Sequence, residues 1–186
     1  MARTSTRSSL SCAALAALER RALAIQLTYF KIPPDARGRL FFALEMVGEM
    51  GELLNDCKKY IRTTQARRRD HQVRARIPEE AADTLVALML LKLAAHDTRC
   101  AAPALPTNVP RGDVAWLHGC LSTLAVHAAR VYAAEARRPR RFNLAAYEQV
   151  VASLQNVAAF FGFSLARATQ RKLTAIIGKV QAGYYD

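Results

Sequence analysis

Two acidic stretches decide the predicted fold: Val47-Gly48-Glu49-Met50-Gly51-Glu52-Leu53 and Glu79-Glu80-Ala81-Ala82-Asp83. Glu49 and Glu52 lie on one face of a helix, and Glu80 and Asp83 have the same spacing in the second stretch. If the two helices pack side by side, four carboxylates converge and repel one another. A hard divalent cation removes this repulsion, because Mg²⁺ prefers oxygen ligands. The pattern predicts a Mg²⁺ site, with Mn²⁺ as the alternative ion.

Composition favours an all-α fold around these helices. The chain has 186 residues, which suits one domain or one domain built from two similar halves. Hydrophobic residues make up 52%, enough for a substantial core, and only 8 Gly and 7 Pro interrupt stretches rich in Ala, Leu, Arg and Glu. We therefore predict a flexible tail over residues 1–9 and a single helical-bundle domain over 10–186.

Hydrophobic periodicity and punctuating residues predict six helices. They cover residues 10–30, 37–61, 78–96, 113–136, 143–161 and 164–181. Asp35 and Asp113 are predicted N-caps, Pro78 suits the first helical position, and Gly162 separates the last two helices. Between the helices we expect a basic loop over 62–76, either a solvated connector or a flap over a polyphosphate. A proline-rich linker over 97–112 and a basic connection over 137–141 complete the plan.

The two halves of the chain share a plan. Residues 113–161 give a long helix, a basic connector and an apolar helix, as residues 37–96 do. Aligning Tyr132 with Tyr60 places Leu121 and Leu124 at the positions of Glu49 and Glu52, and aligning Glu148 with Glu80 places Val151 at Asp83. One interpretation is a pseudo-dimeric tandem repeat. Residues 10–96 would be its active half, and residues 113–186 a degenerate repeat with a closing helix. The other is the general likeness of helical hairpins.

Charge and targeting signals limit which partners and which cellular locations are expected. The formal net charge of +12 attracts polyanions such as nucleotides, nucleic acid or anionic lipid, although a soluble basic protein has the same composition. No apolar run reaches about 18 residues, so no membrane span is expected. Residues 1–18 lack acids and carry Arg3 and Arg7 among Ser, Thr and Ala. This start predicts either a mitochondrial transit peptide or an ordinary disordered start of a cytoplasmic protein.

Cysteine and histidine patterns argue against other chemistries. Cys12, Cys57, Cys100 and Cys120 form no C-x-x-C pair, and their apolar surroundings predict reduced, buried thiols. The four histidines share no metal-binding spacing, and no P-loop or G-x-G-x-x-G stretch is present.

The acid motifs resemble those of the all-α nucleoside triphosphate pyrophosphatases, the MazG-like superfamily. The family signature is E-x-x-E, a spacer, then E-x-x-D, which here reads Glu49-Met50-Gly51-Glu52 and Glu80-Ala81-Ala82-Asp83. The string VGEMGEL is most similar to the dCTP pyrophosphatase branch. The later string FGFSLARATQRKL is similar to the closing segment of the family and places Lys172 at its lysine. Ile176 departs from an asparagine common there, and Lys179 is the nearest later cation, so base preference does not carry over.

The resemblance implies Mg²⁺-dependent hydrolysis of a nucleoside triphosphate to a monophosphate and pyrophosphate, a house-cleaning activity on the nucleotide pool. It implies metal ligation by Glu49, Glu52, Glu80 and Asp83. Glu45, one turn before Glu49, is the candidate to take the proton from water, with Glu49 as its catalytic partner. The candidates for phosphate contact are Lys172, Arg171 and Lys58, and those for stacking on the base are Phe30 and Phe42.

An alternative belongs to another class of function. A catalytically silent, basic helical protein would bind RNA through its basic loops or act as a subunit of a larger assembly, and the charge supports this. Minimal family members dimerise to complete their cores, so self-association is expected unless the second half supplies a built-in partner.

Overall fold

The computed structural model describes residues 10–66, 70–106, 109–110, 112–137 and 141–184. The predicted tail and parts of the basic connectors, including Arg67 to Arg69, lie outside these residues. All regular structure in the described part is helical, as the composition predicted, and no strand occurs there. The helices are α1 Cys12–Ile25, a π-helix Gln26–Phe30, α2 Pro34–Arg37, α3 Arg39–Gln65, α4 His71–Ala94, α5 Val114–Ala136, α6 Leu144–Phe161 and α7 Leu165–Gln181.

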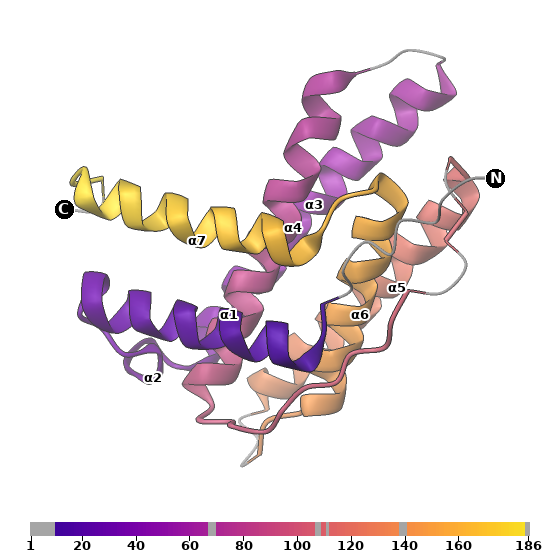
Figure 1. Ribbon diagram of the computed structural model, residues 1–186. Coiled ribbons are helices and arrows are strands. Elements are labelled where there is room, and N and C mark those ends of the chain that lie inside the picture. The colour runs from indigo at the N-terminus through magenta and orange to yellow at the C-terminus, as the bar shows by residue number, and fades with distance from the viewer. Residues whose placement is uncertain (1–9, 67–69, 107–108, 111, 138–140, 185–186) are drawn as a thin grey trace.

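Two helical hairpins form the body of the bundle. α3 and α4 pack along their lengths, α5 packs against both α6 and α3, and α4 also meets α6 (Figure 1). α1 and α7 lie side by side and both cross α4. The central helix is α4, and its segment Leu85–Leu91 is entirely buried, as expected for a helix covered on every side.

Local capping residues explain several helix ends and confirm the predicted boundaries there. Asp113 Oδ1 accepts the backbone N–H of Trp116, so α5 begins where predicted. Gly162 ends α6 in the left-handed conformation, at φ 78°, which a residue without Cβ adopts at little cost. Ser164 then caps α7.

The predicted loop over 62–76 is wrong at both ends. α3 continues to Gln65, and α4 begins at His71, about two turns before Pro78, so Pro78 lies inside the helix. Asp70 caps this early start by accepting the N–H groups of Gln72 and Val73. Such a proline costs about 3 kcal/mol in a helix interior. Here the first turns of α4 are also tied to α3 by the ion pair of Arg76 with Asp56.

The predicted N-cap at Asp35 is also wrong. Asp35 lies inside the short helix α2, and Gly38 separates α2 from α3 at φ 84°. The second predicted helix is thus split by a glycine at a positive φ. Asp35 instead contacts His96, with 3.4 Å between Oδ2 and Nε2.

In the second hairpin, the positions aligned with the acids belong to the core. Leu121, Leu124 and Val151 are all buried. Their side chains complete the packing between α5, α6 and the first hairpin, so this hairpin carries no counterpart of the acid motifs at these positions. The tandem-repeat interpretation stays a prediction.

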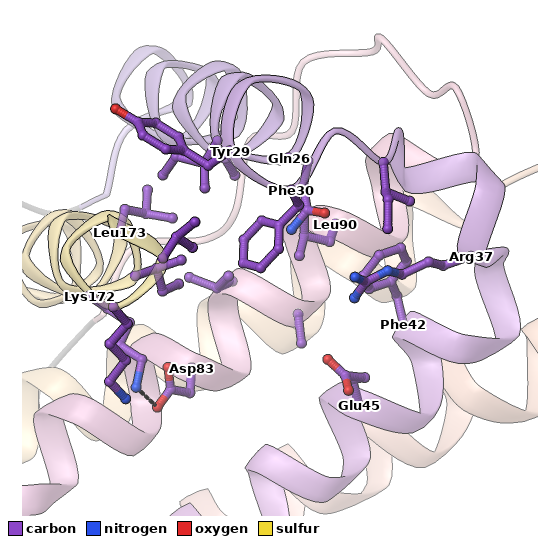
Figure 2. Close-up of a pocket in the computed structure, with 18 of the residues that line it drawn as sticks. Gln26, Tyr29, Phe30, Arg37, Phe42, Glu45, Asp83, Leu90, Lys172 and Leu173 are labelled. Atoms are coloured by element: carbon purple, nitrogen blue, oxygen red, sulfur yellow. Dashed lines mark hydrogen bonds and ion pairs between the residues drawn. The ribbon is translucent and has the colours of Figure 1, made fainter. Parts of the chain in front are cut away.

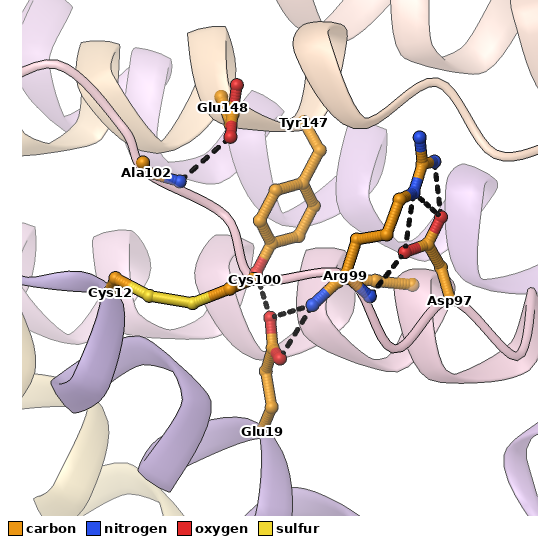
Figure 3. Close-up of polar contacts among 9 residues, drawn as sticks. Cys12, Glu19, Asp97, Arg99, Cys100, Ala102, Tyr147 and Glu148 are labelled. Carbon is orange, nitrogen blue, oxygen red and sulfur yellow. Dashed lines mark hydrogen bonds and ion pairs between the residues drawn. A yellow bond between two sulfur atoms is a disulfide. The ribbon is translucent and has the colours of Figure 1, made fainter.

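The cysteine prediction is half wrong. Cys12 and Cys100 form a disulfide, with 6.3 Å between their Cα atoms, that ties the start of α1 to the segment after α4 (Figure 3). Sequence spacing did not reveal the pair, because the two residues are 88 positions apart and meet only through packing. Cys57 and Cys120 are free and buried as predicted, and burial raises their thiol pKa values to about 12 and about 11.

A buried ion pair holds α1 on α4 next to this disulfide. Lys92 Nζ lies 2.8 Å from Glu19 Oε2, and the Tyr147 hydroxyl donates to Glu19 Oε1 at 2.8 Å (Figure 3). Burial and the Glu19 charge raise the Tyr147 pKa well above its ordinary value, so Tyr147 remains a donor. Removing Glu19 or Lys92 alone would leave an uncompensated buried charge, so the pair favours the contact between α1 and α4, and Tyr147 adds a hydrogen bond from α6.

No single described helix combines the length and apolarity needed to cross a membrane. α6 and α7 taken together pass by length and composition, but the chain bends by 101° between them.

Candidate metal and phosphate site

Three of the four predicted metal ligands converge where α3 and α4 pack. One carboxylate oxygen each from Glu49, Glu52 and Glu80 lies within 4.8 Å of the others. The spacing of three residues puts Glu49 and Glu52 on the α3 face toward α4. Glu80 is buried, Glu49 is half-buried and Glu52 is exposed, so the cluster opens to solvent on one side. Neither Glu49 nor Glu52 has an ion-pair partner in the described part of the chain.

Asp83, the fourth predicted ligand, is paired with the predicted phosphate-binding lysine. Lys172 Nζ lies 2.6 Å from Asp83 Oδ2 (Figure 2). It also lies 3.4 Å from Glu79 Oε1. Lys172 comes from α7, which crosses α4 at this level. Burial alone would lower the Lys172 pKa, but the hydrogen bond and charge of Asp83 outweigh it and raise the pKa. Lys172 is therefore a cation beside the acid cluster.

Arg76 ties the other side of the cluster to α3. Its Nη2 lies 3.1 Å from Glu80 Oε1, and its Nε lies 3.2 Å from Asp56 Oδ2. Asp56 is almost fully buried and also accepts from Lys59 Nζ at 2.9 Å. Arg76 thus bridges Asp56 on α3 and Glu80 on α4. Sequence reasoning missed this role because it placed Arg76 in a loop, although its position four residues before Glu80 was a signal.

A pocket of about 560 Å³ lies between the acid motifs and the α1 end of the molecule (Figure 2). Glu45, Glu49, Asp83 and Lys172 line its polar side. Its other walls come from α1, the π-helix, α2, α4 and α7, and they include Gln26, Tyr29, Phe30, Arg37, Leu90 and Ile176. A charged site thus adjoins a chamber lined by both polar and apolar side chains, an arrangement common in small-molecule sites.

The remaining predicted site residues are spread more widely. Phe30 and Phe42 both line the pocket, but Phe42 is only 1% exposed and packs edge to face against Phe41. Arg171 faces a separate hollow of about 280 Å³ beside Pro78 and Glu79. Lys58 is exposed and does not line either hollow. Of the three predicted phosphate contacts, only Lys172 lies against the acids.

The helical glycines of VGEMGEL leave open space. A Cβ atom added at Gly48 or Gly51 would meet nothing within 4 Å, and both residues are exposed. The described chain itself therefore gives no packing reason for two glycines in the interior of α3. They leave the outer side of the acid cluster free for a ligand or another molecule.

The electrostatics of the cluster fit a divalent cation. Burial, the charges of Asp83 and Glu52, and a smaller contribution from Glu80 raise the pKa of Glu49 to about 7, against the counteracting charge of Lys172. The pKa of Asp83 is also raised, because burial outweighs its contact with Lys172. The carboxylate oxygens lie close together, and too few cations balance their charge. Mg²⁺ and Mn²⁺ prefer such hard oxygen ligands.

Magnesium affinity should therefore depend on pH near neutrality. A proton on Glu49 competes with the ion, so we expect the Kd for Mg²⁺ to fall by roughly tenfold from pH 6 to pH 8. The metal-free protein should show the opposite trend. Its stability should fall as pH rises from about 4.5 to about 7, because the unfolded chain releases this proton first. Calorimetric titration and thermal melts at each pH measure both effects, and a pH-independent Kd would contradict the expected competition.

Comparison of the chain with protein-family models, curated protein sequences and solved structures finds no match. The resemblance of the acid motifs therefore stays a prediction from the residues alone.

Proposed function

We propose that this protein is a Mg²⁺-dependent nucleoside triphosphate pyrophosphohydrolase, which converts a nucleoside or deoxynucleoside triphosphate to the monophosphate and pyrophosphate. One observation carries the proposal. The carboxylates of Glu49, Glu52 and Glu80 converge beside the Asp83–Lys172 pair, at the rim of a pocket large enough for a nucleoside. If these acids were only solvated residues on helix surfaces, nothing would explain why a lysine and a pocket adjoin them.

In this proposal the acidic residues bind the metal ion and the basic residues contact phosphate or hold an acid in place. Glu49, Glu52 and Glu80 would hold the ion, and Asp83 would join them once Lys172 turns toward phosphate. The bound ion supplies charge neutralisation for the triphosphate and lowers the pKa of a coordinated water. Lys172 would contact a phosphate oxygen, and Arg76 would hold Glu80 in place. Glu45 and Glu49 both line the pocket, where either could accept the proton of the attacking water.

The test is pyrophosphate release from a full panel of ribo- and deoxyribonucleoside triphosphates with Mg²⁺ or Mn²⁺. We expect at least one of them to be hydrolysed, with a monophosphate as the second product and no reaction in EDTA. Release of inorganic phosphate instead of pyrophosphate would contradict the proposal, because it would place the cleavage at the wrong anhydride.

The competing function is binding of RNA or of a larger assembly by a silent helical protein. The charge of +12 favours a polyanionic partner of either kind. Salt-sensitive RNA binding, without pyrophosphate release from any triphosphate and without Mg²⁺ binding, would favour this alternative.

A further inference from the structure

Gln26 has a buried amide that the fold does not satisfy. The residue is 7% exposed, and its Oε1 is buried without a hydrogen-bond partner among the described residues. The side chain belongs to the wall of the 560 Å³ pocket, close to Phe30 (Figure 2). Buried polar groups are nearly always paired, so the Gln26 carbonyl lacks a partner that a ligand would supply once the side chain turns toward the pocket.

The backbone around Gln26 is also unusual. Gln26 opens the π-helix Gln26–Phe30, and such wide turns occur frequently at functional sites. Lys31 ends this helix in the left-handed conformation, at φ 54°, and the Gln26 carbonyl accepts the N–H groups of Lys31 and Ile32. A left-handed residue other than glycine is uncommon and persists when its surroundings hold it. The turn places Tyr29 and Phe30 on the pocket wall with Gln26.

The rest of this chamber suits a flat ring. Ile25, Val86, Leu90 and Ile176 provide apolar surface, and Phe30 provides an aromatic one. The Arg37 guanidinium lies 5.9 Å from the centre of the Phe30 ring. Glu45, Asp83 and Lys172 line another side of the same pocket (Figure 2), and so does Glu49. A ligand with a ring at one end and phosphates at the other would satisfy both sides.

We propose that Gln26 is the residue that recognises the base of the nucleotide, by pairing its amide with an edge that carries an N–H donor beside an acceptor. This rests on the proposed function for the phosphate end, but not on hydrolysis. An amide offers one acceptor and one donor, and the edge of a nucleobase offers the complementary pair. The apolar walls and Phe30 would enclose the faces of the ring.

The test compares the binding of two kinds of ligand, one with a base and one without. The probes are inorganic tripolyphosphate and non-hydrolysable α,β-imido nucleoside triphosphates, each with Mg²⁺. We expect Gln26→Leu to weaken the best-bound nucleotide at least tenfold and to leave tripolyphosphate binding unchanged. The same variant should melt at a higher temperature than the wild type, because it removes an unsatisfied buried amide. Gln155→Leu is the matched control, because the Gln155 Oε1 accepts the Leu10 N–H at 2.8 Å. It should lower the melting temperature without selective loss of nucleotide.

Two results would overturn the assignment. Equal loss of both ligands in Gln26→Leu would make Gln26 a structural residue, and no loss of either would leave it outside the site. Failure of the proposed function is visible separately. In that case the wild type would release no pyrophosphate, while selective loss of the imido nucleotide in Gln26→Leu would still support base recognition.

Discussion

We expect Glu49→Gln to reduce Mg²⁺-dependent pyrophosphate release at least about 100-fold, because it removes one of three carboxylates that converge within 4.8 Å. The change keeps the size and shape of the side chain and removes only its charge. Since neighbouring acids and burial raise the Glu49 pKa to about 7, its charged form is disfavoured in the metal-free fold. The variant should therefore melt at the same or a higher temperature than the wild type at pH 8, without metal. Loss of activity together with retained stability would separate a functional from a structural role.

Glu148→Gln is the matched control for this variant. Glu148 lies on α6, outside the pocket, and its Oε1 accepts the Ala102 N–H at 2.8 Å, which a glutamine oxygen can still do (Figure 3). The activity of Glu148→Gln should equal that of the wild type.

Asp83→Asn should resemble Glu49→Gln in activity, and it also loses the charge that faces Lys172. Full activity in both site variants would contradict the assignment of the metal site.

Loss of the Cys12–Cys100 disulfide should have the largest effect on stability. The bond closes a loop spanning 88 positions, for which the loss of unfolded-chain entropy corresponds to roughly 4–5 kcal/mol. A domain is stable by only about 5–15 kcal/mol, so reduction removes a large part of the total. For a chain of this size, the melting temperature should fall on the order of 10 °C. Melts with and without dithiothreitol measure the shift.

The double variant Cys12→Ser, Cys100→Ser provides the control for reduction. It should melt near the temperature of the reduced wild type and should not respond to dithiothreitol, since its remaining thiols, Cys57 and Cys120, are free and buried. Titration of unfolded, unreduced wild type should find two thiols. Four thiols would contradict the disulfide and restore the prediction of fully reduced cysteines.

Loss of the disulfide should reduce activity less than it reduces stability. The disulfide ties down the start of α1, and the residues of α1 that line the pocket lie near its other end, at Ala22 and Ile25. The buried Glu19–Lys92 pair lies between these two ends and would still hold α1 on α4 after reduction. We expect the reduced protein to keep its site at temperatures well below its melting point.

The parts of the fold that the sequence predicted depend on short-range chemistry. The six main helices follow from apolar periodicity, and Asp113 and Gly162 mark ends that the structure confirms. Capping and a left-handed glycine act within about one turn of the backbone. The convergence of Glu49, Glu52 and Glu80 was also predictable, because the spacing of three residues selects a helical face and the apolar character of α4 makes it the partner.

Two predicted helix starts are wrong because other caps, a glycine and one contact between helices outweigh the residues that marked them. Pro78 is typical of a first helical position, yet the Asp70 cap and the pairs of Arg76 with Asp56 and Glu80 extend α4 back to His71. Gly38, rather than a cap at Asp35, governs the start of α3. In both places the outcome depended on groups on another element or on a backbone angle that residue type alone does not specify.

The sequence alone therefore predicted an all-α chain with four acids on two facing helices, because these features depend on residue type and spacing within each helix. Only the tertiary structure decided that Asp83 meets Lys172, that Cys12 meets Cys100 and that the Gln26 amide is buried beside a pocket. Both pairs lie almost ninety positions apart, and Gln26 is buried where α7 packs against the π-helix that it opens. Such contacts follow from how the helices cross, which no local pattern specifies.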